Sequence, residues 1–318
     1  MSPRLTRAVG WDGTKCNPSF SAIDAQTGGI TVNGSVAGSG NSATSAGGAL
    51  YAAAGNISTT QDVNLTSNTA NNGNGGAIDA VAGTVTLASD SGNVTLSNNL
   101  ASGNSNGGAV YSPQAVTIGN TAGTVDIENN EAGYASGAPQ NRTSQGGAIY
   151  SGATVTVNGS AITLSGNNVP LNGGGIYAVQ GVAVNGDITA SSNNAGTNAT
   201  NGNGGAIAVE SGNANLATST GDVSLTNNSA TNGGAVYAMV TFRSVTPAAR
   251  TPLPATLQRV MAAQLTPLAP LPSRAPPRCQ TTPRRRAAAC ILAEPSRALA
   301  TSPLTRTPPP QATAARLR

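Results

Sequence analysis

Residues 223–237 read VSLTNNSATNGGAVY, and variants of this stretch recur along most of the chain. Its second half is a Gly-Gly pair, a small residue and an aliphatic residue, which occurs seven times with steps of 28, 32, 39, 27, 31 and 29 residues. A fixed period of this size predicts a stacked repeat architecture. The pairs are Gly47 and Gly48, Gly75 and Gly76, Gly107 and Gly108, Gly146 and Gly147, Gly173 and Gly174, Gly204 and Gly205, and Gly233 and Gly234.

The first half of the unit is a short aliphatic run that leads into an Asn-rich corner. Apolar and polar residues alternate within these runs, as around Val155 and Val157, which predicts strands with one buried face. No stretch has the spacing of an amphipathic helix, because Gly and Asn interrupt every candidate. The asparagines that we expect to close the corners are Asn68, Asn99, Asn130, Asn168, Asn194 and Asn228.

A unit of about 28 residues holds roughly three short strands and their corners, which suits one coil of a parallel β-helix. Glycine allows a positive φ at a tight corner and close approach of the next coil, and equivalent asparagines can hydrogen-bond along the stack. Aromatic residues make up only 3% of the chain, so the interior must be thin. We therefore predict an all-β fold, a right-handed parallel β-helix of about seven coils. The alternative of a disordered low-complexity chain does not explain the fixed period.

Five tyrosines follow the Gly-Gly pairs at the same position of the unit. A stacked row of them could form a binding stripe, since tyrosine offers a large contact area at low entropic cost. The same row could instead only cover the edge of the coil, and the sequence leaves both interpretations open. The residues are Tyr51, Tyr111, Tyr150, Tyr177 and Tyr237.

From Gly47 to Tyr237 the chain resembles the polymorphic outer membrane proteins, best known from chlamydiae, whose double motif pairs Gly-Gly-Ala-aliphatic with an upstream Phe-x-x-Asn. Here Leu or Ile replaces that Phe, as at Leu65, Leu96, Ile127 and Leu225. The resemblance implies an autotransporter-type passenger at the outer membrane, the cell surface or the extracellular space. It also implies a non-enzymatic adhesin whose partner is a host-cell surface protein or glycan. Neither a signal peptide within residues 1–20 nor a transmembrane segment is evident in the sequence.

The composition changes after Phe242. None of the 40 glycines lies beyond it, whereas the segment holds most of the 19 prolines and of the 16 basic residues. We expect residues 1–40 to be a lead-in or cap, residues 41–242 the β-helix, and residues 243–318 a Pro-, Arg- and Ala-rich disordered tail. The formal net charge of +4 comes from that tail. Its basic residues lack interleaved aromatics or a recognition motif, so nucleic acid is not an expected partner.

The tail also reads as the same repeat in another frame. Shifting each implied codon back by one base lets residues 279–293 encode LSNNTAAAGGGVYSG, and the same offset permits Gly-Gly pairs at Ala262, Ala287 and Ala314. Those positions continue the visible period with steps of 29, 25 and 27 residues. We predict a frameshift between Tyr237 and Phe242, and an inactive frameshifted gene fragment stays an alternative.

The side chains needed for most catalytic chemistry are scarce. The chain has no His, and Cys279 and Cys290 lie in the tail, which leaves Cys16 alone, so we expect neither a metal site nor a cofactor. The other alternative is a β-helical carbohydrate-active enzyme, with an acid pair or calcium site at Asp126, Glu128 and Glu131 and a nearby Arg142. Other candidate carboxylates of the repeat region are Asp79, Asp90, Asp187, Glu210 and Asp222.

Overall fold

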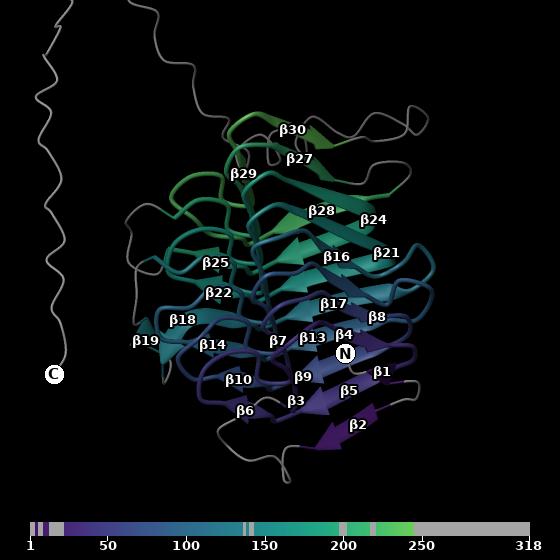
Figure 1. Ribbon diagram of the computed structural model, residues 1–318. Helices are drawn as coiled ribbons and strands as arrows, with labels where there is room; N and C mark the ends of the chain where they lie inside the picture. Colours follow the sequence, from purple (N-terminus) through teal and green to yellow (C-terminus); the bar gives the residue numbers. More distant parts are fainter. Residues whose placement is uncertain are drawn as a thin grey trace, which may run out of the picture. The chain divides into compact units, whose positions relative to one another are not determined.

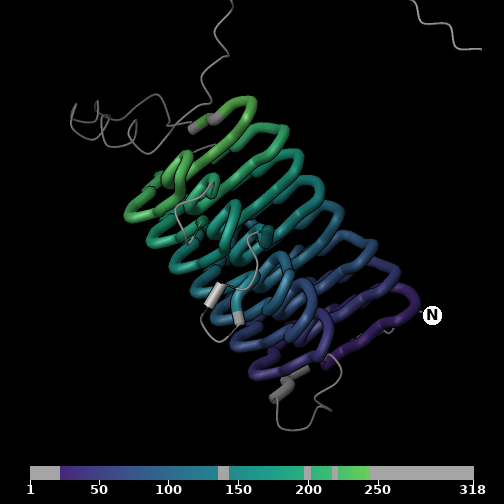
Figure 2. Tube along the Cα trace, turned by 90° about the vertical axis from the view of Figure 1, so that its left-hand side faces the viewer, coloured from purple at the N-terminus to yellow at the C-terminus, as the bar shows by residue number. Residues whose placement is uncertain are grey.

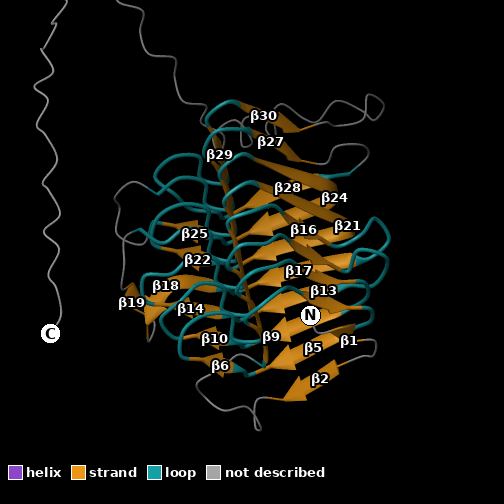
Figure 3. Cartoon of the chain, in the orientation of Figure 1, coloured by secondary structure: helices purple, strands orange, loops and turns teal. Residues whose placement is uncertain are grey.

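The computed structural model describes residues 4–5, 9–12, 22–135, 138–139, 143–196, 202–216 and 221–244. Over these residues the chain forms strands and turns and no helix (Figure 3). The predicted all-β parallel β-helix is confirmed. The predicted disordered tail lies outside the described residues from residue 245 onward, as do Cys16 and Arg142.

The strands form three sheets that run along the stack of coils (Figure 1). The eight-stranded sheet consists of β3 (Ile23–Ala25), β7 (Leu50–Ala52), β11 (Ile78–Ala80), β15 (Val110–Ser112), β20 (Ile149–Ser151), β23 (Ile176–Ala178), β26 (Ile207–Val209) and β29 (Val236–Ala238). The seven-stranded sheet consists of β6 (Ser42–Ala43), β10 (Thr69–Ala70), β14 (Leu100–Ser102), β18 (Glu131–Ala135), β19 (Ala138–Pro139), β22 (Asn168–Val169) and β25 (Asn194–Ala195).

The fifteen-stranded sheet has two columns, because each coil crosses it twice. One column holds β1 (Arg4–Leu5), β4 (Ile30–Val32), β8 (Ile57–Thr59), β12 (Val85–Leu87), β16 (Val116–Ile118), β27 (Asn213–Leu216) and β30 (Thr241–Ser244). The other holds β2 (Val9–Asp12), β5 (Val36–Ser39), β9 (Val63–Thr66), β13 (Val94–Ser97), β17 (Thr124–Glu128) and β28 (Val223–Thr226). Two long strands, β21 (Thr154–Ser165) and β24 (Gly181–Ser191), join the columns.

Successive coils stack in register (Figure 2). Ile78 of β11 pairs with Leu50 of β7 and with Val110 of β15, so equivalent residues of the repeat lie directly above one another. Strand pairs in the described ranges are parallel apart from β18 with β19. Each interior coil therefore satisfies its backbone N–H and C=O groups through the coils on either side.

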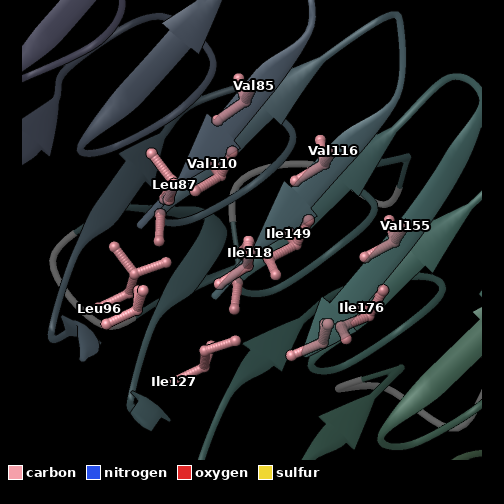
Figure 4. Packing of buried hydrophobic residues seen from close by; sticks show 14 of the residues in the cluster. Val85, Leu87, Leu96, Val110, Val116, Ile118, Ile127, Ile149, Val155 and Ile176 are labelled. Atoms are coloured by element: carbon pink, nitrogen blue, oxygen red, sulfur yellow. The ribbon is translucent and has the colours of Figure 1, made fainter. Parts of the chain in front are cut away.

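The core is a narrow column of aliphatic side chains. Alternate residues of each strand point inward, as in β13, where Val94 and Leu96 are fully buried. Figure 4 shows these inward side chains packing against their equivalents from neighbouring coils, with Val85, Val116 and Val155 forming one such series. Within the described residues no aromatic ring belongs to this core cluster, which agrees with the thin interior expected from the composition. Tyr134 and Tyr177 are buried but lie outside it.

Two features depart from a uniform repeat. The 39-residue step between Gly107 and Gly146 contains an insertion in which β18 and β19 form the antiparallel pair. The coil also begins earlier than the expected boundary of residue 40, because β3, β4 and β5 already pair in register with β7, β8 and β9. That coil lacked a visible motif because Phe20 and Ser21 stand where later units have Gly-Gly. At the other boundary, β30 continues to Ser244, two residues past the expected end at 242.

Because the described ranges contain no helix, they hold no apolar helix of a length that crosses a bilayer.

Candidate functional site

The two glycines of each pair have different physical roles. The first adopts a positive φ in every copy, from 58° at Gly233 to 68° at Gly146 and Gly173, which a residue with a side chain adopts only under strain. The second lies against the backbone of the next coil, and a Cβ on Gly147 would stand 2.0 Å from the carbonyl oxygen of Gly174. The pair thus turns the chain into the eight-stranded sheet and lets the next coil approach.

A ladder of asparagines, buried except at its last member, runs along another corner of the coils, where the chain passes from the fifteen-stranded to the seven-stranded sheet. The backbone N–H and the side-chain Nδ2 of Asn99 both donate to Oδ1 of Asn130, at 3.0 Å each, and Asn99 Nδ2 also donates to the carbonyl of Leu65 at 2.9 Å. Asn99 therefore connects its own coil to the coil before it and to the coil after it. The ladder consists of Asn41, Asn68, Asn99, Asn130, Asn167, Asn193 and Asn228.

Two of the expected corner asparagines are wrong by one residue. The ladder passes through Asn167 and Asn193, whereas Asn168 and Asn194 begin β22 and β25 and bond to each other at 3.1 Å. The corner needs two adjacent residues: one with positive φ, such as Asn98, and then the ladder residue, such as Asn99. In the two deviating units Gly166 and Ser192 adopt the positive φ, so the first asparagine of each pair takes the ladder position.

The tyrosines point outward from the eight-stranded sheet, one residue after its buried aliphatic position. Tyr111, Tyr150 and Tyr177 occupy three consecutive levels and their rings are stacked, with centroids 5.1 Å and 5.4 Å apart. Burial raises the pKa of all three phenols, so they are neutral at physiological pH. Along the stack, the residues at this register are Asp24, Tyr51, Asp79, Tyr111, Tyr150, Tyr177, Ala208 and Tyr237.

Asp79 and Ala208 interrupt the row, so the five tyrosines do not form the single continuous stripe that their common position suggested. Asp79 separates Tyr51 from Tyr111, is 2% exposed, and its Oδ1 has no hydrogen-bond partner. Burial raises the pKa of Asp79 to about 7. Ala208 separates Tyr177 from Tyr237. Counting the register of each Gly-Gly unit in the sequence would have identified both positions.

The candidate acid cluster does not assemble as one group. Asp126 and Glu128 share the outward face of β17, as their parity in the sequence suggested, and Ser165 Oγ donates to Glu128 Oε1 at 3.1 Å. Glu131 begins β18 in the seven-stranded sheet, beyond the asparagine corner. Within the described ranges, no three carboxylate or other metal-ligating side chains gather at one point. The pairing of this cluster with Arg142 falls outside the described residues.

The other carboxylates are dispersed along the coil and bond locally. Asp187 Oδ1 accepts the backbone N–H of Asp222 at 2.9 Å, and Asp90 Oδ1 accepts Ser89 Oγ at 3.0 Å. Glu210 accepts the hydroxyl of Tyr177. Only the last of these carboxylates contacts a tyrosine of the row.

Two segments of the chain match a repeat that is known from other proteins. The Chlamydia polymorphic membrane protein repeat matches residues 93–113 and 222–239. Each match includes a ladder asparagine, a Gly-Gly pair and a tyrosine of the row, namely Asn99 to Tyr111 in the first and Asn228 to Tyr237 in the second. Searches of curated proteins and of solved structures found no match. The match indicates a protein of the outer-membrane or cell-surface type, and the chain carries the repeats of the polymorphic membrane protein family.

Proposed function

We propose that this chain is the non-enzymatic passenger of an autotransporter-type surface protein and that it binds a host-cell surface protein or glycan through the tyrosine row. The family match supports a surface location. The repeated coil supports display, because stacking further copies lengthens a rigid scaffold without requiring a larger core.

The observation that carries the proposal is the stack of Tyr111, Tyr150 and Tyr177. The strands hold these rings at a fixed spacing on one lateral face, so little side-chain entropy remains to be lost when a partner binds. Tyrosine is enriched among the residues that dominate binding interfaces, since a large apolar ring ends in a polar hydroxyl. Tyr111 and Tyr150 are partly exposed and so accessible to a partner, whereas Tyr177 is buried and supports the stack from one end.

Binding of the purified, fluorescently labelled full chain to epithelial cell monolayers tests the proposal. The test variant is the double substitution Tyr111→Ala with Tyr150→Ala, which removes two adjacent rings. The matched control is Thr117→Ala with Thr156→Ala, because these threonines pair with each other at the same two levels on the outward face of the fifteen-stranded sheet. Circular dichroism and thermal unfolding check that both variants keep the β-helix.

We expect the wild-type chain to bind saturably and the tyrosine variant to bind at least about tenfold more weakly. The threonine control should stay within about twofold of the wild type. Equal binding by the tyrosine variant would place adhesion elsewhere on the molecule. An absence of saturable binding by the wild-type chain would contradict the adhesive function itself.

A further inference from the structure

Tyr111 and Tyr150 form the more accessible of the two stacked ring pairs in the tyrosine row. Their strands, β15 and β20, pair in parallel and bring the two residues to the same position of adjacent coils. The ring centroids lie 5.1 Å apart with 15° between the ring planes, and both side chains are partly exposed. Two adjacent phenols are the starting material for one covalent modification, the oxidative joining of two tyrosines into dityrosine.

This modification needs two phenols and an oxidant that accepts two electrons. Each phenol loses one electron and one proton and becomes a neutral phenoxyl radical, whose unpaired electron is shared with the two Cε atoms beside the carbon that bears oxygen. A Cε atom of one radical then forms a carbon–carbon bond with a Cε atom of the other, and each ring returns the hydrogen of that carbon to its oxygen. The two electrons and two protons that were removed reduce one hydrogen peroxide to two waters, with a peroxidase as the catalyst.

The coils hold the two rings close enough to couple while the backbone stays in place. Neighbouring parallel strands lie about 4.8 Å apart, so Tyr111 and Tyr150 are attached at the closest regular spacing that the stack offers. The last torsion of an aromatic side chain has a broad energy minimum. Because both side chains are partly exposed, their rings have room to turn from face-to-face stacking until the Cε atoms meet.

The third ring of the stack is held more firmly than the other two. Tyr177 stacks on Tyr150 with centroids 5.4 Å apart, but its side chain is buried and its hydroxyl donates to Glu210. Turning this ring would break that hydrogen bond, and burial keeps an oxidant away from the phenol. Tyr150 is therefore expected to couple with Tyr111 and not with Tyr177.

The outer members of the row have no ring at the adjacent level on the side of the stack. Asp79 follows Tyr51 along the coils, and Ala208 precedes Tyr237. Two strand spacings, about 10 Å, then separate each outer tyrosine from the next ring of the row. Tyr51 and Tyr237 are partly exposed, as the coupled pair is, so they are open to oxidation but lack a neighbour for coupling.

We propose that Tyr111 and Tyr150 are a site of oxidative cross-linking, at which peroxide and a peroxidase join their Cε atoms into a dityrosine that connects two adjacent coils. The two residues are 39 positions apart in the sequence, and a covalent link that closes such a loop stabilises the folded chain by constraining the unfolded one. The described ranges contain no cysteine, so a disulfide cannot supply this link there. The cross-link forms whether or not the row binds a partner.

Treatment of the dilute, purified full chain with hydrogen peroxide and a haem peroxidase tests the site. Dityrosine fluorescence measures the product, a denaturing gel separates internally linked chains from linked pairs of chains, and mass spectrometry of a protease digest identifies the joined peptides by the loss of two hydrogens. The test variants are Tyr111→Phe and Tyr150→Phe, which keep the ring but lack the hydroxyl from which the radical forms. The matched controls are Tyr51→Phe and Tyr237→Phe, which remove a hydroxyl at the same position of other coils.

We expect the wild-type chain to form an internal link between the peptides that contain Tyr111 and Tyr150, and each test variant to form at least about tenfold less product. Both controls should stay within about twofold of the wild type. The treated wild-type chain should also unfold at a higher urea concentration than the untreated chain, whereas treated Tyr150→Phe should show no such shift.

Four results would overturn the cross-linking site: no dityrosine in the treated wild-type chain, links only between separate chains, joined peptides that contain other tyrosines, or an undiminished yield from Tyr150→Phe. Loss of product in Tyr51→Phe or Tyr237→Phe to the same extent as in Tyr150→Phe would equally contradict it, because adjacency of the rings would then not decide which tyrosines couple.

Discussion

The coil at β11–β14 and the last described coil, at β28–β30, carry the same motifs but differ in what lies next to them. In the interior coil, Leu96 is fully buried, and a Cβ on Gly76 would meet the carbonyl oxygen of Gly108 at 2.2 Å. In the last coil, Leu225 is only partly buried, and a Cβ on Gly234 would meet nothing nearer than 3.4 Å. The motif therefore defines the shape of a coil, and the neighbouring coils supply most of its stability.

Restoring the shifted reading frame should have the largest effect on the difference in stability between the interior coil and the last described coil. We propose that the tail encodes further coils in another frame, so a gene corrected between codons 237 and 242 should give the last coil a neighbour. The expected result is a higher Tm and stronger hydrogen-exchange protection of β28 and β29. Stop codons in the alternative frame of the coding DNA, or no gain in protection, would contradict the frameshift and with it the alternative of an inactive fragment.

A Gly-to-Ala substitution should lower the free energy of unfolding much more in an interior coil than in the last described coil. Gly147→Ala places a Cβ 2.0 Å from the carbonyl of Gly174 and 2.7 Å from that of Asn168, so the coils must move apart. We expect a loss of roughly 3 kcal/mol or more in the free energy of unfolding. Gly234→Ala, with its nearest atom at 3.4 Å, should cost about 0.5 kcal/mol or less. Urea unfolding measures both, and equal losses would show that close approach is not what requires glycine.

Replacing a ladder asparagine should likewise destabilise the chain more in an interior coil than in the last described coil. Asn130→Ala deprives Asn99 of its acceptor and leaves the carbonyl of Leu96 without the bond that it receives at 2.9 Å, in a fully buried corner. Buried groups without partners cost about 1–3 kcal/mol each, so we expect a loss of roughly 3 kcal/mol. Asn228→Ala should cost about 1 kcal/mol, because water reaches the partly exposed end of the ladder. Similar losses at both sites would exclude burial as the cause.

The pH dependence of the free energy of unfolding should come from Asp79, which lies in an interior coil. Burial raises the pKa of Asp79 to about 7 from an ordinary 3.8, so the folded chain holds this proton more tightly than the unfolded chain. Stability is then highest below about pH 4 and declines as the pH rises to about 7, by roughly 2–4 kcal/mol. Asp79→Asn should flatten this profile. Asp24→Asn is the control at the same register, where the side chain is exposed, and it should leave the profile unchanged.

Much of the coil was predictable because its constraints are local. Alternation of Val and Leu gives the strand faces, and the positive φ of Gly47 and its equivalents follows from the Gly-Gly repeat. The prediction of the ladder residue was wrong in two units, because Asn167 and Asn168 are chemically identical and only the distance from Leu164 distinguishes them. A spacing of three residues after the inward aliphatic residue would have identified the ladder position.

The candidate site was less predictable because it depends on pairs of residues in different coils. The five tyrosines were found by their common position, but the row is continuous only where consecutive coils each contribute one, as at Tyr111, Tyr150 and Tyr177. The break in the row at Ala208 is defined by what one coil lacks relative to its neighbours. It becomes visible when the Gly-Gly units are aligned with one another, and not from the positions of the tyrosines alone.

Hydrogen–deuterium exchange resolved along the chain tests the central claim most directly, namely that neighbouring coils stabilise each other through backbone ladders. We predict the slowest exchange in β13 and β17, which have paired strands on both sides, and progressively faster exchange through β24 to β28 and β30. Uniform exchange along the stack, or exchange in β13 as fast as in β28, would contradict the account.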